Sequence, residues 1–335
     1  MYRVAVIGCG GRGKAHARGY KACPKTELVA CADPDDGARA AFAAAFEVPG
    51  SYADYREMLE RERPDLVSIC TWTPLHKEMA LAAVAAGVKA IHCEKPIAPT
   101  WGDSQELVSA CQQAGVVITF CHQRRFEAPF VAARRLVQEG AIGRLVRIEG
   151  YCPNMFDWGT HWFDMFFFYN DQTPALWVMG QVDYSAPRSV FGVPVDTQGI
   201  SYIQYANDVV GLMITGEGCG RSLQNLIVGT EGIIRVNAGA PRLEVLRFGS
   251  DWEQPSLEGV VAHRDPTAAT VFDLVDALET GREPELSGRK ALQATELIFA
   301  TYESSRSRGR VILPLQSKDS ALLTMIERGE LGAVS

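Results

Sequence analysis

Several features that define whole classes of proteins are missing from this sequence. No apolar run reaches about 18 residues, so we expect no membrane-spanning helix. The 33 lysines and arginines are outnumbered by 40 acidic residues, and the net charge of −7 offers no general attraction for nucleic acid or anionic lipid. Internal repeats and long linkers are absent, and the short, glycine-bounded start does not look like a signal peptide. We therefore expect a cytoplasmic protein with no nucleic-acid or membrane partner.

Cysteine is present, but not in the spacings that mark metal sites or redox pairs. The nine cysteines form no C-x-x-C pair and no Cys/His cluster at zinc spacing, so no metal site is expected. Five of them each close an apolar run: Cys9, Cys31, Cys70, Cys93 and Cys121. Small apolar thiols pack well where strands end, so packing is favoured over a redox role.

The first apolar run, residues 3–7, leads into a glycine-rich turn and then a helix-compatible stretch. The turn contains Gly8, Gly10, Gly11, Arg12 and Gly13 in the spacing G-x-G-x-x-G. This order of strand, glycines and helix predicts a dinucleotide site. The first glycine permits a tight turn, the second lets the backbone approach a pyrophosphate, and the last allows close helix packing. The free N–H groups of the helix N-terminus would then face the phosphates.

A second apolar run, residues 28–32, ends at Asp33, twenty positions after Gly13. An acid at this position accepts hydrogen bonds from both ribose hydroxyls and repels a 2′-phosphate, which predicts NAD as the cofactor. NADP is less favoured, although Arg39 lies close enough in sequence to accommodate that phosphate. Asp33 could instead, or in addition, cap the helix that begins after Pro34.

Strand-like and helix-like segments alternate as far as residue 121. The further strand-like runs are residues 66–70, 88–93 and 116–120. This alternation predicts a doubly wound parallel sheet with right-handed crossovers. Ligands of such sheets bind beyond the carboxyl ends of the strands, and several polar residues follow strands here: Gly8, Asp33, Thr73, Lys95 and His122.

The second half has a different pattern, of short alternating segments separated by turn residues. They are residues 145–150, 181–183, 199–205, 209–215, 223–228, 233–236 and 242–247. The pattern predicts a large, mostly antiparallel open sheet, with helices only at 129–139, 268–280, 292–306 and 320–328. A sheet covered on one side leaves an apolar face, so a homodimer or homotetramer through this sheet is expected.

The length suggests two domains. The predicted division is an NAD(P)-binding Rossmann domain at residues 1–121, an α/β domain for substrate binding and oligomerisation at 122–315, and a tail at 316–335.

One stretch of the second half combines acids, an imidazole and aromatic residues: Asp157-Trp158-Gly159-Thr160-His161-Trp162-Phe163-Asp164. If it is helical, Asp157, His161 and Asp164 share one face. A carboxylate beside an imidazole fixes its tautomer and steadies its charged form, as a general base requires. The same pairs also occur on solvated helices, and the spacing alone favours that ordinary interpretation.

Taken together, these motifs resemble the glucose–fructose oxidoreductase, inositol dehydrogenase and MocA family, from about residue 3 to 315. The residues that carry the resemblance are 8–13, Thr73-Pro74 with His76, Glu94-Lys95-Pro96, Gln123-Arg124-Arg125-Phe126 with Pro129, 140–143, 157–164, 229–232, Ser287-Gly288, Glu296, Ala300, Ser304 and Pro314-Leu315. The resemblance implies a Rossmann domain, a second domain with a large open sheet, and redox chemistry on a hydroxyl of a sugar, cyclitol or similar polyol with NAD or NADP.

The resemblance also implies the catalytic residues. The family lysine matches Lys95, its D-x-x-x-H pair matches Asp157 and His161, and Pro96 would position the lysine. We expect His161 to take the hydroxyl proton, Asp157 to orient it, and Lys95 to stabilise the alkoxide, all at one hydroxyl. Residues 151–156 replace the usual glycine-rich lead-in, so the identity of the polyol stays open.

The remaining candidates have ordinary alternatives as well. Cofactor contacts are expected from Thr71, Thr73, Pro74, His76, Glu94, Lys95 and Pro96, and substrate contacts from Lys95, Gln123, Arg124, Arg125, Trp158, His161, Trp162 and Asp164. The arginines could instead pair with acids, and Lys95 could be a surface lysine. The aromatic run of Trp158, Trp162, Phe163 and residues 166–169 is more simply explained as core, with Trp158 and Trp162 as the likeliest exceptions because they flank His161. Two other functions stay open: an NAD-dependent glycosidase or lyase that oxidises its sugar transiently, and a non-catalytic NAD sensor.

Overall fold

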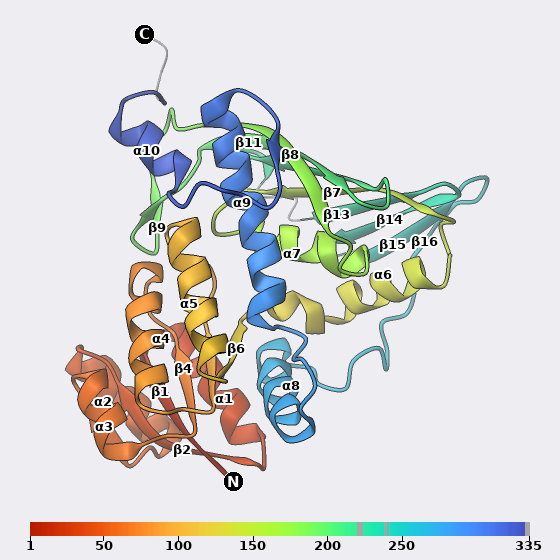
Figure 1. The fold of residues 1–335 in the computed structure, drawn as a ribbon. Coiled ribbons are helices and arrows are strands. Elements are labelled where there is room, and N and C mark those ends of the chain that lie inside the picture. Colours follow the sequence, from red (N-terminus) through yellow and green to blue (C-terminus); the bar gives the residue numbers. More distant parts are fainter. Residues whose placement is uncertain (220–223, 238–239, 241, 332–335) are drawn as a thin grey trace. The chain divides into compact units, whose positions relative to one another are not determined.

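Six parallel strands form the sheet of the first of two compact units (Figure 1). The computed structural model describes residues 1–219, 224–237, 240 and 242–331. Unit 1 comprises Met1–Pro99, Asp103–Phe126 and His263–Leu292, and unit 2 comprises Thr100–Gly102, Glu127–Ala262 and Gln293–Ser335. The domain boundaries predicted from the sequence stay a prediction.

The strand order in unit 1 is that of a dinucleotide-binding fold. The strands are β1 (Tyr2–Ile7), β2 (Thr26–Ala32), β3 (Gly50–Tyr52), β4 (Leu66–Ile69), β5 (Ala90–Cys93) and β6 (Val117–Phe120). They lie in the order β3-β2-β1-β4-β5-β6, and every pair is parallel. This order reverses direction at β1, and ligands of such sheets bind at that point, beyond the carboxyl ends of the strands. The predicted doubly wound sheet is confirmed.

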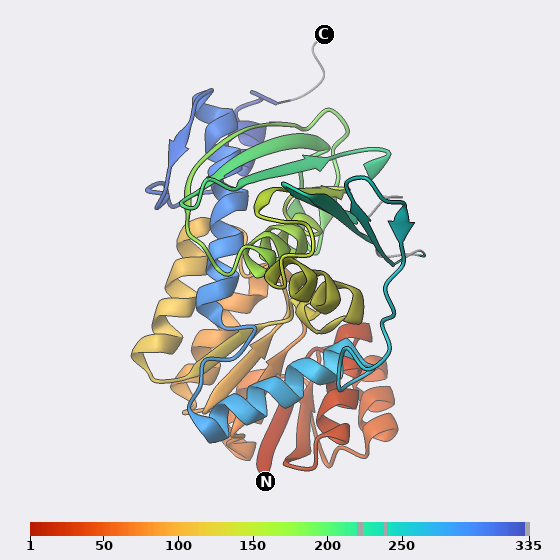
Figure 2. The same cartoon turned by 90° about the vertical axis from the view of Figure 1, so that its right-hand side faces the viewer.

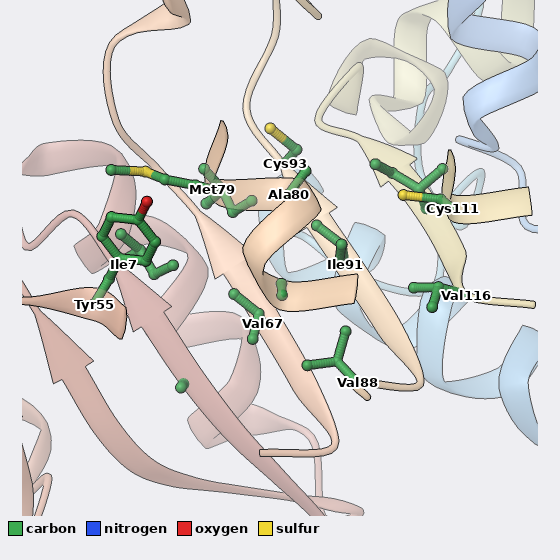
Figure 3. Close-up of a cluster of buried hydrophobic side chains, with 14 of the residues drawn as sticks. Ile7, Tyr55, Val67, Met79, Ala80, Val88, Ile91, Cys93, Cys111 and Val116 are labelled. Atoms are coloured by element: carbon green, nitrogen blue, oxygen red, sulfur yellow. The ribbon is translucent and has the colours of Figure 1, made fainter. Parts of the chain in front are cut away.

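Helices cover both faces of this sheet because successive strand residues are apolar on both sides. The helices of unit 1 are α1 (Gly11–Ala22), α2 (Asp36–Phe46), α3 (Tyr55–Glu62), α4 (His76–Ala85), α5 (Trp101–Gln113) from residue 103 onward, and α8 (Pro266–Thr280). One core joins alternate strand residues such as Ile7 to α3, α4 and α5, and Figure 3 shows Val67, Ala80 and Ile91 among its side chains. The other core joins residues such as Val6 to α1, α2 and α8.

Helix α8 lies far along the chain from the rest of unit 1, yet it completes that second core. Gly19 of α1 makes the close approach possible, because a Cβ there would lie 2.9 Å from Val271 Cγ2 and 3.0 Å from Ala268 Cα. Val271 and Leu274 of α8 are fully buried in the same core. The helix begins at an N-cap, Asp265, whose side chain accepts hydrogen bonds from the first turn.

Unit 2 is built on nine strands, most of them antiparallel. The strands are β7 (Leu145–Cys152), β8 (Ala175–Asp183), β11 (Gln198–Tyr205), β12 (Val210–Thr215), β13 (Gln224–Gly229), β14 (Gly232–Asn237), β15 (Leu243–Arg247), β16 (Trp252–Glu253) and β17 (Val311–Ile312). Their order is β16-β15-β14-β13-β7-β12-β11-β8-β17, and β7 with β12 is the parallel pair. A separate hairpin joins β9 (Ser189–Val190) to β10 (Val193–Pro194). The predicted mostly antiparallel sheet is confirmed, although β8 begins six residues before the predicted run at 181–183.

The helices of unit 2 pack on one face of this sheet, as Figures 1 and 2 show for α6 (Ala128–Gln138) and α7 (Gly159–Tyr169). Every residue of α7 is buried. Phe166 fits against the sheet where β7 and β12 carry Gly150 and Gly211, since a Cβ on either would lie 3.1 Å from its ring. The interpretation of the aromatic run as core is therefore confirmed for Phe163 and residues 166–169, and Trp162, one of its two expected exceptions, is fully buried as well. The unit also contains α9 (Gly288–Ser307) from residue 293 and α10 (Ala321–Glu327).

The opposite face of the sheet is apolar. Strand alternation turns Met179, Ile200, Tyr202 and Leu212 to that side, and Met179 and Ile200 are 52% and 46% exposed.

Among the described residues, no helix has the length and apolar character needed to cross a membrane.

Candidate functional site

The glycine turn after β1 has the geometry of a diphosphate cradle. Gly8 has φ +96°, and a Cβ there would lie 2.4 Å from the Cys70 carbonyl oxygen. A Cβ on Gly13 would lie 1.9 Å from the Gly8 carbonyl oxygen, so α1 can approach β1 only through glycine. A Cβ on Gly10 would meet nothing within 4 Å, and no side chain caps α1 there. The N–H groups of the first turn are thus open to an anionic ligand.

A cavity of about 380 Å³ lies beside this turn, within the size range of small-molecule sites. Its polar wall contains Gly8, Gly10, Asp33 and Thr71. Its other lining residues are largely apolar: Ile7, Ala32, Pro34, Ala53, Tyr55, Cys70, Trp72, Leu75 and Met79. The cavity therefore combines a phosphate-binding turn and a carboxylate with an apolar wall, which suits the adenosine half of a dinucleotide. The residues present fit NAD.

Asp33 is held in place by backbone N–H groups at the mouth of this cavity. Cys9 N donates to its Oδ2 at 2.8 Å, and Asp35 N donates to its Oδ1 at 2.9 Å. The helix-capping alternative is wrong, because Asp35 is the N-cap of α2 and accepts from Ala38 N at 2.6 Å. Arg39 donates to the Asp33 carbonyl oxygen at 2.6 Å and pairs with Asp36.

Glu94 connects the glycine turn to the end of β5. Its Oε1 accepts from Arg12 Nε at 2.6 Å and lies 3.0 Å from His16 Nε2. Burial alone would raise the pKa of Glu94, but the hydrogen bond from His16 and the charges of His16, Arg12 and Lys95 together hold that pKa well below its usual range. A buried carboxylate is stable only when it is paired in this way. Because Lys95 is the next residue, the same contacts hold the backbone that carries it.

Next to Glu94 lies a cluster of three side chains that could in principle bind a metal ion. No sequence motif predicts this cluster. The ligand atoms of His16, His92 and Cys121 lie within 4.8 Å of one another, and all three residues are buried. Both rings have hydrogen-bond partners on each nitrogen: His16 with Ser68 at 2.7 Å and Glu94, His92 with Thr119 at 2.8 Å and Thr270 at 2.9 Å. The Arg12 Nη2 donates to the Cys121 Sγ at 3.3 Å, which places a cation beside the thiol. These contacts account for the cluster as a hydrogen-bonded core.

The His76 ring contacts two of the predicted cofactor-binding loops, one at Thr71 and one at Pro96. Its Nε2 lies 3.1 Å from the Thr71 carbonyl oxygen and its Nδ1 lies 2.9 Å from the Pro96 carbonyl oxygen. Burial lowers the pKa of His76, and the two carbonyls act in the opposite direction. Thr73, which with Pro74 opens a short 3₁₀ helix, is 1% exposed, and its Oγ1 has no hydrogen-bond partner among the described residues.

The residues that follow β6 differ in their surroundings. Gln123, Arg124 and Arg125 lie in the 3₁₀ helix Gln123–Phe126. Arg125 is buried, and its Nη1 pairs with Glu285 Oε1 at 2.8 Å, so for this residue pairing with an acid is confirmed. Gln123 and Arg124 are half-buried, as is Lys95.

In unit 2, Asp157 lies in a turn and not on the helix with His161. Helix α7 begins at Gly159, so the prediction of one helical face for residues 157–164 is wrong at its start. Asn154 is the reason: its Oδ1 accepts from Asp157 N at 2.7 Å, and its carbonyl oxygen accepts from Gly159 N at 2.9 Å. Asp157, His161 and Asp164 are all buried, and the rings of Trp158 and His161 lie 6.3 Å apart.

A buried carboxylate that the sequence did not reveal, Asp196, pins this turn. It accepts from Met155 N at 2.9 Å, from Thr215 Oγ1 at 2.9 Å and from Tyr302 Oη at 2.8 Å. Burial raises the pKa of Asp196, although these hydrogen bonds act in the opposite direction. The contacts join the turn to β12 and α9, so the position of Asp157 depends on three distant segments.

Trp162 and Trp158 differ in their surroundings. Trp162 is fully buried, donates from Nε1 to the Tyr151 carbonyl oxygen at 2.8 Å, and stacks on Phe130 of α6. Trp158 is half-buried, as a substrate-contacting side chain can be. The predicted residues thus form two groups, Lys95 and the cofactor candidates in unit 1, and Asp157, His161 and Asp164 in unit 2.

Comparison with known proteins points to redox enzymes. Residues 2–122 match the model of the oxidoreductase family with an NAD-binding Rossmann fold. The chain is 28% identical to D-apiose dehydrogenase of Paraburkholderia graminis over 360 residues, covering 98% of this chain and 94% of that protein. It is 32% identical to 2,7-anhydro-N-acetylneuraminate hydratase of Mediterraneibacter gnavus over 148 residues, or 44% of this chain and 37% of that protein.

Solved structures share the fold. Levoglucosan dehydrogenase in complex with NADH and levoglucosan matches with a TM-score of 0.81 and 23% identity, covering 93% of this chain and 99% of that one.

Two buried tyrosines test whether the Asp196 contacts hold unit 2 together. Tyr302→Phe removes a hydroxyl that donates to the buried carboxylate, and hydrogen bonds to charged groups are worth about 1.5–3 kcal/mol. We expect the free energy of unfolding to fall by about that amount in urea titrations. Tyr205→Phe is the matched control, since its buried hydroxyl has no hydrogen-bond partner among the described residues and its removal should cost nothing. Equal effects of the two substitutions would contradict the role of Asp196.

Proposed function

Because this chain belongs to the glucose–fructose oxidoreductase, inositol dehydrogenase and MocA family of NAD-binding Rossmann-fold oxidoreductases, we propose that it is an NAD-dependent dehydrogenase acting on a secondary hydroxyl of a sugar, cyclitol or related polyol. The observation that carries the proposal is the cavity of unit 1, where the open glycine turn, Asp33 and an apolar wall meet. The similarity to D-apiose dehydrogenase over nearly the whole chain supports a carbohydrate hydroxyl as the reacting group.

The chemistry divides between the cofactor and three side chains. The glycine turn and Asp33 would hold NAD, which would supply the hydride-transfer chemistry at the carbinol carbon. His161 would accept the hydroxyl proton, and Asp157 would orient the imidazole and balance its charge. Lys95 would stabilise the negative charge that develops on the alkoxide oxygen. The other hydroxyls of the substrate would contact four further side chains: Asp164, Trp158, Gln123 and Arg124.

Substitution of the proposed catalytic residues tests these roles. Lys95→Met and His161→Asn should each lower kcat by about 10²–10⁴-fold, the range typical of general acid–base steps, while the Kd for NAD changes little. Asp157→Asn should lower kcat as well, through His161. The measurement is NADH formation, by absorbance, on a panel of sugars and cyclitols.

Lys89→Met is the control for the lysine substitution. This lysine pairs with Asp65 and lies next to β5 at the opposite end of the strand from Lys95. The Lys89→Met substitution should therefore leave the turnover unchanged. Unchanged turnover in Lys95→Met would overturn the assignment.

A second candidate function follows from the hydratase among the relatives. An enzyme that oxidises a sugar transiently acidifies the neighbouring carbon, which permits elimination or hydration before the hydride returns. NADH then does not accumulate, whereas a dehydrogenase forms one NADH per product. Product analysis beside NADH absorbance separates the two. We favour the dehydrogenase because the dehydrogenase relative covers nearly the entire chain.

The position of Asp33 favours NAD over NADP. Its carboxylate lies at the cavity and would repel a 2′-phosphate, while Arg39 already contacts the Asp33 carbonyl oxygen and Asp36. By calorimetry, we expect the unsubstituted protein to bind NAD clearly more tightly than NADP. The Asp33→Ala variant should bind NAD more weakly, so that the affinities for NAD and NADP become more similar. Glu57→Ala, which removes an exposed acid that pairs with Arg61 and does not line the cavity, is the control and should leave both affinities unchanged. If the unsubstituted protein binds NAD and NADP with equal affinity, the proposed role of Asp33 in favouring NAD is wrong.

The apolar face of the nine-stranded sheet fits a second copy of this chain. Four of its charged residues pair within the chain, Arg147 with Glu149 at 2.6 Å and Arg235 with Glu244 at 3.1 Å, so these charges would not repel those of an identical face. We expect a dimer or a higher assembly built from dimers, by light scattering at micromolar protein. The double variant Met179→Lys, Ile200→Lys should dissociate it. Phe191→Lys, on an exposed apolar residue outside this sheet, should not. A monomeric unsubstituted protein would refute the proposal.

A further inference from the structure

Trp72 is exposed to an unusual degree for its size. The side chain is 64% exposed, more than any other large apolar residue after Met1 among the described residues. It also lines the cavity that contains Gly8, Gly10 and Asp33. Exposed aromatic side chains beside a cavity often mark contact with a ligand, because leaving them in water is unfavourable. The sequence motifs predict cofactor contacts at Thr71 and Thr73, on either side of this residue, but not at Trp72 itself.

The backbone under Trp72 is fixed, so its exposure does not come from a loose loop. Its carbonyl oxygen accepts from Leu75 N at 2.9 Å, which closes the short 3₁₀ helix. The preceding residue, Thr71, has its carbonyl oxygen 3.1 Å from the buried His76 ring, which also contacts Pro96. The loop thus fixes the backbone from which the indole projects, so a ligand that contacts the indole need not order the loop, which lowers the entropic cost of binding.

The arrangement of the cavity identifies the part of the cofactor that would meet this indole. Asp33 marks the ribose and the Gly8–Gly10 backbone marks the diphosphate, so the base attached to that ribose must lie against the apolar wall. Two aromatic residues belong to the lining, and Tyr55 is only 8% exposed, with its hydroxyl donating to Glu78. Trp72 is the aromatic lining residue with a face available for stacking.

We propose that Trp72 stacks on the adenine ring of NAD and determines the affinity of this site for the adenine half of the cofactor; the inference rests on the NAD-dependent function proposed above. Stacking between an aromatic side chain and a base, measured by substitution with alanine, corresponds to about a tenfold change in affinity or more. Trp72 thereby acts on the affinity for the cofactor and takes no part in proton or hydride transfer.

Fluorescence titration with fragments of the cofactor tests the assignment. ADP-ribose should quench the emission of the unsubstituted protein, and Trp72→Ala should lose that quenching and bind both NAD and ADP-ribose about tenfold more weakly. Nicotinamide mononucleotide, which has no adenine, should bind equally to both proteins. Trp72→Phe should recover most of the affinity, because it keeps an aromatic face. Trp252→Ala is the matched control: this indole is also exposed, at 39%, but does not line the cavity.

The possible outcomes are distinct. Unchanged ADP-ribose affinity in Trp72→Ala overturns the inference, and a loss confined to nicotinamide mononucleotide overturns it by placing the indole at the other end of the cofactor. If the unsubstituted protein binds neither NAD nor ADP-ribose, the inference and the proposed function fail together. If ADP-ribose binding depends on Trp72 but no polyol is oxidised, the inference stands and the proposed dehydrogenase activity fails.

Discussion

The paired, buried carboxylate of Glu94 is the interaction on which the candidate cofactor site depends. It lies at the end of β5 and accepts from Arg12, in the first turn of α1, and it contacts His16 one turn further along the same helix. A carboxylate buried without partners would be strongly destabilising, whereas one with an arginine and an imidazole remains ionised and fixes both. The glycine turn and the loop that carries Lys95 are therefore held by one group, and neither can shift without loss of these hydrogen bonds.

Unit 2 uses the same physical device at a different place. Asp196 is completely buried, and three donors from separate segments converge on it, among them the backbone N–H of Met155. The turn that contains Asp157 is consequently fixed from beneath, while Asn154 fixes it from within. In each unit, then, residues proposed for chemistry sit on a loop whose backbone is tied to a buried acid. Such loops keep their geometry without ligand, as positioning for catalysis requires.

Glycine serves two different purposes in this fold, and the distinction matters for function. Gly13 and Gly19 are contact glycines, where a Cβ would collide with the Gly8 carbonyl or with Val271. At Gly10 no atom lies within 4 Å of the position of a Cβ, so packing does not explain the residue. Its openness instead leaves room for a ligand to approach the backbone, which is what the diphosphate of a dinucleotide needs. The spacing of the motif predicts both purposes but does not separate them.

The sequence by itself determined the class of both halves and the cofactor loop, because these depend on local rules. Strand periodicity, the G-x-G-x-x-G turn and the position of Asp33 involve residues within about 30 positions of one another, and such βαβ units have few alternative geometries. The family resemblance added Lys95, Asp157 and His161, whose roles remain proposals. It was local pattern, too, that suggested a core role for the aromatic run, which the burial of α7 confirms.

Only the tertiary structure decided which side chains meet across long sequence separations. The contact between His16 and Glu94 spans 78 positions and that between Asp196 and Tyr302 spans 106, and no periodicity or spacing rule connects residues so far apart. For the same reason the sequence could not place α8 on the sheet of unit 1. The start of α7 at Gly159 is set by a local contact with Asn154, and only the structure shows that this contact forms a turn at Asp157 in place of a further helical turn. The exposure of Trp72 could not be predicted from the sequence, because exposure is a property of the folded surface. Local sequence sets the elements, and burial of charge and apolar area between distant elements sets the site.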